Sequence, residues 1–233
     1  MKIEILGVKI DIIDRQGVIT KISEWLRGES QHLVTTINPE FLVEANKNKE
    51  FKDVLNFASL NTCDGMGLVL MSGRKLIRVT GVDITEDLLN GKMTGAKLYL
   101  LGGSQTSIDK LRKKYSNIVG GRSGGKLKDG KFENQHEIIE DIKSSKANII
   151  LVALGQVKQE KWINDNLSKI KQVRVGIGIG GTFDYLSGEF KRPPKVFRSL
   201  GLEWLYRLIK QPSRIGRIWR AVVVFPLLVL LKK

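Results

Sequence analysis

This chain of 233 residues has few cysteines and histidines, and it has few acidic residues near its C-terminal end. Cys63 is the only cysteine, so no disulfide can form within the chain, and a reducing compartment suits it. The two histidines, His32 and His136, are too isolated to indicate a zinc site. After residue 190 the only acidic residue is Glu203. Apolar runs are also short, since none approaches the ~20 residues that a helix needs to cross a bilayer.

The formal charge is +15, and much of this excess lies after residue 190. Such a field attracts phosphates, nucleic acid or acidic lipids without distinguishing them. The chain opens with no charged, apolar leader, so we expect a cytoplasmic protein. Its length can bury a full core, most simply in one domain.

The last segment of the chain combines cations with an apolar run. The run covers residues 221–231, which is enough to lie in a membrane surface but not to cross it. We therefore expect an α/β domain over residues 1–191 and a membrane-docking appendage over 192–233, on an anionic surface. The alternative is a helix packed on its own core or on a dimer partner. The cations recur at helical spacing, which predicts a stripe on one face: Arg207, Lys210, Arg214, Arg217 and Arg220.

Between residues 3 and 179, β-rich runs alternate with helical patterns. This alternation predicts a Rossmann-like, mostly parallel sheet with helices on both faces. We expect strands at 3–6 and 9–12 (a small hairpin), 33–37, 60–63, 97–101, 118–119, 149–154 and 173–179. The predicted helices are 15–27, 40–58, 66–72, 85–89, 106–115, 135–144 and 160–170.

Ligands bind open parallel sheets at the carboxyl ends of the strands, so residues that follow the strands are the candidates for a site. Thr36 lies at the end of one predicted strand and Asn38 follows it, although helix capping alone would explain Asn38. Asp64 follows the next strand, in an Asp-Gly pair that is usually only a turn, but a carboxylate there can act as a general base. Gly102 and Gly103 form a turn that lets backbone N–H groups approach a phosphate.

One glycine-rich segment imitates a dinucleotide fingerprint. It covers residues 176–181, but it lies at the end of the α/β part and no helix-length pattern clearly follows it. We therefore do not interpret it as an NAD site.

Short motifs along the chain, in order from about residue 3 to Arg220, resemble the WecG/TagA/CpsF family of bacterial glycosyltransferases. Two local departures are Val157, where the family often has proline, and Pro193, where alanine is common. The motifs are Thr36-x-Asn38-x-Glu40, Asp64-Gly65-x-Gly67, Arg78-x-x-Gly81-x-Asp83, Leu101-Gly102-Gly103, Leu154-Gly155-x-x-x-Gln159-Glu160, Gly180-Gly181-x-Phe183-Asp184, Arg192-x-Pro194 and Gly201-Leu202-Glu203-Trp204.

The resemblance implies transfer of N-acetylmannosamine from a UDP donor to undecaprenyl-diphosphate-linked GlcNAc, with a β-1,4 bond, in wall teichoic acid synthesis. A family sibling would use UDP-N-acetylmannosaminuronic acid or UDP-glucose instead. The enzyme would work on the inner face of the cell membrane. Without a membrane the apolar face of residues 222–231 has to be covered, so we expect a homo-oligomer in solution and a monomer on the membrane. A non-catalytic module that binds nucleic acid or anionic lipid is the competing hypothesis, and it leaves the polar residues at the strand ends unexplained.

The chemistry of such a transfer assigns roles to residues. A sugar hydroxyl is a poor nucleophile, so Asp64 is the candidate base, with Thr36 beside it. The sequence has no Asp-x-Asp motif, so we expect no metal or other cofactor, and cations and amides stabilise the leaving diphosphate instead. The expected donor-binding residues are Asn38, Arg78, Gly102, Gly103, Gln159, Glu160, Gly180 and Asp184, and those for the lipid diphosphate are Arg207, Arg214, Arg217 and Arg220.

Overall fold

A computed structural model of the chain describes residues 1–125, 127–128, 130–190, 194, 197, 203–210 and 212–231, without the side chains of Glu203, Arg207, Lys210 and Arg214. The predicted domain boundary at residues 192–194 lies outside the described residues, except for Pro194.

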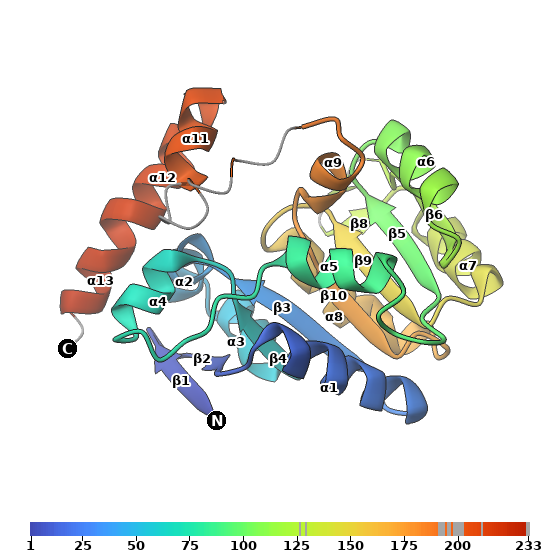
Figure 1. Cartoon of the computed structure of the whole chain (residues 1–233), viewed down its shortest axis with the longest axis horizontal. Helices are drawn as coiled ribbons and strands as arrows, with labels where there is room; N and C mark the ends of the chain where they lie inside the picture. The colour runs from blue at the N-terminus through green and yellow to red at the C-terminus, as the bar shows by residue number, and fades with distance from the viewer. Residues whose placement is uncertain are drawn as a thin grey trace.

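A six-stranded parallel sheet forms the centre of the molecule, as predicted (Figure 1). Its order is β4-β3-β10-β9-β5-β6, so the last strand in the chain lies near the middle of the sheet. Helices connect the strands because parallel neighbours need a crossover. The strands are β3 (His32–Ile37), β4 (Leu60–Cys63), β5 (Leu98–Gly102), β6 (Ile118–Arg122), β9 (Ile149–Ala153) and β10 (Val175–Gly178).

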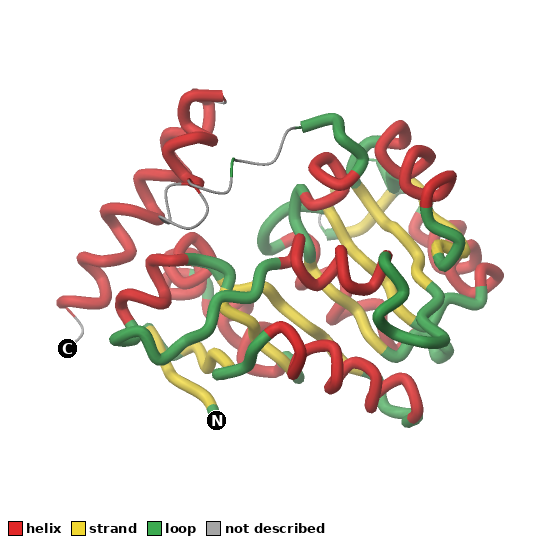
Figure 2. Tube along the Cα trace, in the orientation of Figure 1, coloured by secondary structure: helices red, strands yellow, loops and turns green. Residues whose placement is uncertain are grey.

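Helices cover both faces of this sheet, because alternate strand residues point to opposite sides (Figure 2). Leu98 and Leu100 join the core under the first set of helices, whereas Tyr99 and Leu101 join the core under the second. The first set is α1 (Arg15–Arg27), α5 (Gly81–Leu89) and α6 (Gln105–Lys114). The second set is α3 (Lys49–Phe57), α7 (Gln135–Ser145) and α8 (Lys158–Asn166).

Several predicted helix bounds need correction. The single helix expected at 40–58 is two helices, α2 (Pro39–Lys47) and α3, because the Asn48 side chain accepts a hydrogen bond from Phe51 N and starts a new helix. Helix α5 begins at Gly81, four residues earlier than predicted, behind a capping box formed by Thr80 and Asp83. Helix α8 ends at Asn166, and a 3₁₀ turn follows it.

Two hairpins flank the main sheet. The predicted N-terminal hairpin is confirmed as β1 (Lys2–Ile5) and β2 (Val8–Asp11), which pack on a third apolar core with α2, α3 and α4 (Met66–Met71). The second hairpin, β7 (Leu127–Lys128) and β8 (Lys131–Phe132), was not predicted, because its strands are only two residues long.

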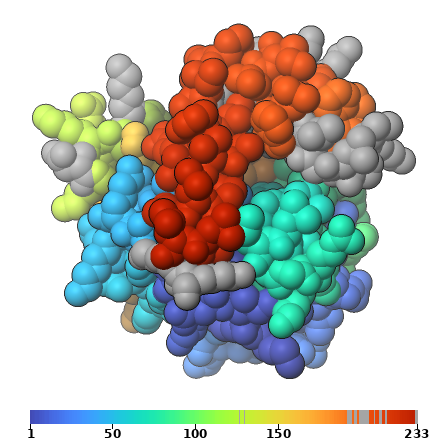
Figure 3. Space-filling view, turned by 90° about the vertical axis from the view of Figure 1, so that its left-hand side faces the viewer, coloured from blue at the N-terminus to red at the C-terminus, as the bar shows by residue number. Residues whose placement is uncertain are grey.

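The C-terminal appendage is helical, as expected, but it changes geometry several times. It runs through α11 (Glu203–Lys210), a 3₁₀ turn at Pro212–Arg214, α12 (Ile215–Trp219), a π-helical stretch at Arg220–Val224 and α13 (Phe225–Leu231). In Figure 3 the red C-terminal end of the tail lies between α2 and α4, and α13 contacts both. Phe225 is fully buried in the third core, so the alternative of packing on the protein's own core holds for one side of the tail.

The other side of the tail is apolar and exposed. Its exposed residues are Ile209, Ile215, Trp219, Val222, Leu227, Leu230 and Leu231. Among the helices that the structure describes, none combines the length and the apolar character needed to span a membrane.

Candidate functional site

Parallel strands end at the same edge of the sheet, so the residues that follow them share one surface. Asp64 follows β4, Asn38 follows β3, Gly180 follows β10, and Gly102 ends β5. A short helix, α9 (Thr182–Leu186), starts after β10. This edge is where open α/β sheets bind ligands.

The Asp64 carboxylate lies half-buried beside the start of α5. Its Oδ2 accepts a long hydrogen bond from Gly81 N, 3.5 Å away, and its backbone N donates to Ile37 O at 2.6 Å. The helix N-terminus favours the ionised carboxylate. Asp64 thus presents a carboxylate at the mouth of the edge, and an ionised carboxylate is the form that can accept a proton.

Arg78 reaches the same turn from a neighbouring segment. It forms an isolated parallel bridge with Cys63, and Val79 N donates to Cys63 O at 2.8 Å. Burial raises the pKa of the Cys63 thiol to about 12, and the charge of Asp64 adds to this, so the thiol stays protonated and is no nucleophile. Asp64 and Arg78 are therefore both neighbours of an inert cysteine, since Asp64 follows it in the chain and Arg78 pairs with it across the bridge.

Thr36 and Asn38 are occupied by structural hydrogen bonds. The buried Thr36 donates Oγ1–H to Gly178 O at 3.1 Å, which ties β3 to β10. Asn38 Oδ1 accepts from Phe41 N at 3.1 Å and caps α2, as the capping alternative anticipated.

Gln159 and Glu160 lie under the edge rather than on it. Glu160 is fully buried, and its two oxygens accept from Val157 N at 2.8 Å and from Gln159 Nε2 at 2.6 Å. Gln159 Oε1 accepts in turn from Gly180 N at 3.0 Å. Burial raises the pKa of Glu160 to about 7. The pair joins the turn after β9 to the turn after β10 and offers a ligand almost no surface.

Two backbone features depend on this pair. A Cβ at Gly178 would lie 2.5 Å from Glu160 Oε1, so only glycine fits at this position of β10. Val157 has φ +72°, which is strained for a β-branched residue and is held by its bond to Glu160.

The glycine turn after β5 lets two strands approach closely. Gly102 has φ +94°, and a Cβ there would lie 2.5 Å from Ala153 O. Gly103 N donates to that same Ala153 O at 3.1 Å. Asp184, in α9, accepts from Ser107 Oγ at 3.2 Å and thereby joins α9 to α6.

Two adjoining pockets open over β5, β6 and β9. A pocket of about 430 Å³ includes Gly103, Leu154 and Lys158 in its lining, and one of about 740 Å³ includes Gln105 and Arg122. They adjoin because Ser123 and Gly125 line both. The sequence interpretation missed this second glycine turn, although Gly124-Gly125 follows a strand as Gly102-Gly103 does.

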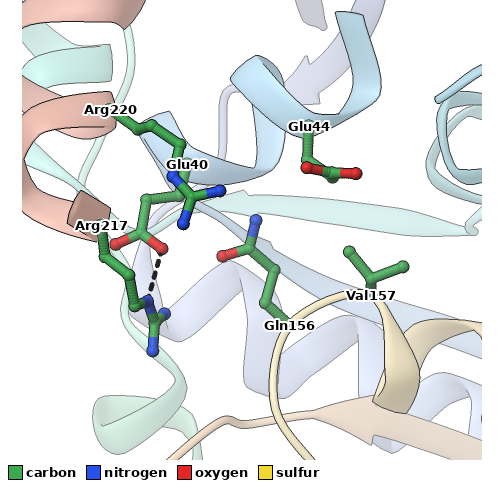
Figure 4. A pocket seen from close by; sticks show the side chains of 6 residues that line it. All are labelled: Glu40, Glu44, Gln156, Val157, Arg217 and Arg220. Atoms are coloured by element: carbon green, nitrogen blue, oxygen red, sulfur yellow. Dashed lines mark hydrogen bonds and ion pairs between the residues drawn. The ribbon is translucent and has the colours of Figure 1, made fainter. Parts of the chain in front are cut away.

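A third pocket, of about 260 Å³, lies between part of the tail and the α/β body (Figure 4). Glu40 Oε2 accepts from Arg217 Nε at 2.8 Å across it. Arg220 lines the same pocket, whereas the side chains of Arg207 and Arg214 lie outside the description.

No cluster of three or more His, Cys, Asp or Glu suited to a metal ion occurs in the described part of the chain. The strand edge offers a carboxylate, an arginine and glycine turns. Two tail arginines face α2 and the loop after β9 across the third pocket. Comparison with known families gives this arrangement a context. A model of the family described as Glycosyl transferase WecG/TagA/CpsF matches residues 3–233, and the chain belongs to that family.

Proposed function

We propose that this glycosyltransferase moves N-acetylmannosamine from UDP-N-acetylmannosamine to the GlcNAc of undecaprenyl-diphosphate-GlcNAc. The product would carry the β-1,4 linkage unit of wall teichoic acid. The proposal rests on the family match over residues 3–233. The carboxylate of Asp64 at the strand edge supplies a candidate base for the transfer.

Asp64 is the proposed base. It accepts the proton of the acceptor hydroxyl while that oxygen attacks the anomeric carbon and the bond to UDP breaks. Its place beside the N-terminus of α5 keeps it ionised before the reaction. Arg78, near the same turn, is the proposed cation for the leaving diphosphate.

The donor is proposed to lie along the strand edge. Its nucleoside would occupy the adjoining pockets over β6, β5 and β9, with the diphosphate near Gly103 and Lys158. Three strand spacings, roughly 14 Å, separate β9 from β4, where Asp64 lies. An extended sugar diphosphate can cover much of this distance. Thr36, Asn38, Gln159, Glu160, Gly180 and Asp184 would then shape the edge through their hydrogen bonds rather than grip the donor.

The acceptor is proposed to arrive from the cytoplasmic face of an anionic membrane. The exposed apolar side of the tail would lie in the lipid surface. Arg217 and Arg220 face the body, and Arg207 and Arg214 belong to the same tail. The lipid diphosphate would pass among these arginines.

A donor panel tests the sugar assignment. The wild-type enzyme is incubated with one short-chain, diphosphate-linked GlcNAc acceptor and with UDP-ManNAc, UDP-N-acetylmannosaminuronic acid or UDP-glucose in turn. We expect transfer with UDP-ManNAc at the highest kcat/KM. Preference for another donor would assign the chain to a sibling activity, and salt-sensitive binding of nucleic acid without transfer would favour the non-catalytic hypothesis.

Metal independence is a further prediction. Arginines and amides are proposed to stabilise the leaving group, so transfer should survive EDTA. The measurement is the initial rate before and after chelation. Loss of the rate with EDTA and its recovery with Mg²⁺ or Mn²⁺ would contradict this part of the proposal.

A further inference from the structure

The pocket between α2 and the tail is built from opposed donors and acceptors. Glu40 and Glu44 lie one helical turn apart on α2, and Arg217 and Arg220 face them from the tail (Figure 4). Gln156 reaches the same space from the loop after β9. The pocket thus joins three segments that are far apart in the sequence.

The charges of the four ionised side chains in this lining cancel, and Glu44 also forms an ion pair at 3.3 Å with Lys47, which lies outside the lining. Two carboxylates oppose two guanidinium groups, and Glu40 already accepts a hydrogen bond from Arg217 at 2.8 Å. An anionic diphosphate placed here would meet both glutamates and would have to displace one of them from its arginine. A neutral, polyhydroxylated ligand suits the lining better, because its hydroxyls donate to carboxylates and accept from guanidinium groups.

Size and shape narrow the ligand further. The volume of about 260 Å³ lies below the ~300–1,000 Å³ of sites for drug-sized ligands, so a single ring fits better than a nucleotide. Among the described residues of the lining, Val157 provides the one apolar side chain, which suits the methyl of an N-acetyl group. Its strained backbone is fixed by Glu160, so this contact has a defined place.

The pocket also lies close to the proposed base. Glu40 directly follows Pro39, and a Cβ on Gly65, next to Asp64, would lie only 2.9 Å from Pro39 Cδ. The turn that carries Asp64 therefore packs against the first turn of α2, and Glu40 of that turn lines the pocket.

We infer that this pocket binds the neutral N-acetylated sugar of the acceptor, and that Glu40, Glu44 and Gln156 are its specificity-determining residues. The inference rests on the proposed function and deepens it. The Glu40–Arg217 ion pair then has two roles: it holds the tail against the body and presents a carboxylate to a sugar hydroxyl. The lipid diphosphate would lie outside the pocket, at its rim, within reach of the tail arginines.

Single variants test recognition with farnesyl-diphosphate-GlcNAc as the acceptor. Glu44→Ala and Gln156→Ala should each raise the acceptor KM by about 10-fold, because a hydrogen bond to the sugar is lost. The donor KM should change little, and Glu44→Gln, which keeps an acceptor oxygen, should lose less than Glu44→Ala. Glu50→Gln is the matched control, since Glu50 forms an ion pair between α3 and Lys161 of α8 at 2.5 Å, outside the pocket.

A charge exchange separates recognition from tethering. Glu40→Arg combined with Arg217→Glu can restore the ion pair while moving the carboxylate to the other wall. Hydrogen exchange of residues 203–231 should show a docked tail in this double variant, yet its acceptor KM should stay raised. Recovery of both tail docking and the wild-type acceptor KM would show that the ion pair only holds the tail in place, and it would overturn the role of the pair in sugar recognition.

Direct binding keeps this inference separate from the donor assignment. Binding of the farnesyl-diphosphate-GlcNAc probe is measured by calorimetry without any donor. Weaker binding in Glu44→Ala and Gln156→Ala would support the pocket even if UDP-ManNAc proved to be the wrong donor. Unchanged binding and unchanged acceptor KM in both folded variants would overturn the inference, while transfer by the wild type would leave the proposed function intact.

Discussion

The carboxylate of Asp64 is the group whose chemistry can be removed with the smallest change in shape. Asp64→Asn keeps the side-chain volume and one acceptor oxygen toward Gly81 N, but it cannot accept a proton. We expect kcat to fall by ~10²–10⁴ while UDP binding changes little. Asp165→Asn, at an exposed position of α8, serves as the control. Near-wild-type turnover of Asp64→Asn would remove Asp64 from the role of base.

Glu160 makes a prediction about pH. Its pKa is raised from 4.5 to about 7 by burial, so the folded protein holds this proton more tightly than the unfolded chain. The stabilisation is fully present below pH 4.5 and is lost as the pH rises through about 7, by on the order of 3 kcal/mol.

Urea unfolding between pH 4.5 and 8 measures this effect. Glu160→Gln does not titrate, so its free energy of unfolding should fall less with pH than that of the wild type, even though the amide leaves one donor poorly paired. Glu50→Gln, at an exposed position, should keep the wild-type slope. Equal slopes in the wild type and Glu160→Gln would show that Glu160 does not titrate in this range.

Residue roles were only partly predictable from the sequence. Asn38, Gln159 and Glu160 follow strands, which is visible in the sequence, but their burial and hydrogen bonds depend on β10 being inserted between β3 and β9. A polar residue after a strand can cap, position or bind, and only tertiary contacts distinguish these roles. For Asn38 the cap was foreseen as an alternative.

At the scale of elements, periodicity predicted the strands and most helices, because buried parallel strands are continuous apolar runs. It could not predict the break at Asn48, since apolar spacing continues through α2 and α3 while one side chain starts the second helix. The order of the strands in the sheet could not be predicted from the sequence either, because a parallel crossover can place the next strand on either side of the previous one.

The turn between β5 and α6 gives a prediction at this scale. Gly102→Ala combines a positive φ of 94° with a Cβ only 2.5 Å from Ala153 O, whereas Gly91→Ala has φ +72° and open space. Gly91→Ala should cost ~1–2 kcal/mol from backbone strain alone.

Gly102→Ala should cost clearly more, because β5 and β9 must also move apart. Thermal unfolding of both variants measures the difference, which should appear as a lower Tm for Gly102→Ala. A similar loss in both would show that the close approach of the two strands contributes nothing beyond the backbone conformation.

At the scale of the whole molecule, the tail has two apolar sides with different surroundings. Phe225 lies in the third core, whereas Trp219, Leu227 and Leu230 are exposed. We propose that an anionic lipid surface covers this patch, because exposed apolar patches of this kind mark contact surfaces and the same tail carries several arginines. In solution without lipid, a second copy of the chain can cover the same patch.

We therefore predict oligomers in detergent-free buffer that give way to monomers on vesicles containing phosphatidylglycerol. Trp219 fluorescence should shift to shorter wavelength on these vesicles, but little on vesicles of phosphatidylcholine alone, and added salt should weaken binding. Trp219→Phe identifies the contribution of this tryptophan among the four in the chain.

A paired substitution separates docking from catalysis. Leu227→Glu with Leu230→Glu should abolish vesicle binding and oligomer formation, because it places carboxylates on the exposed apolar side while Phe225 stays in the core. Transfer to a water-soluble acceptor should continue in this variant, whereas transfer to acceptor embedded in vesicles should fall. If the variant still bound phosphatidylglycerol vesicles as the wild type does, the exposed side of the tail would not be the membrane-docking surface, and the arginines alone would have to account for the attraction.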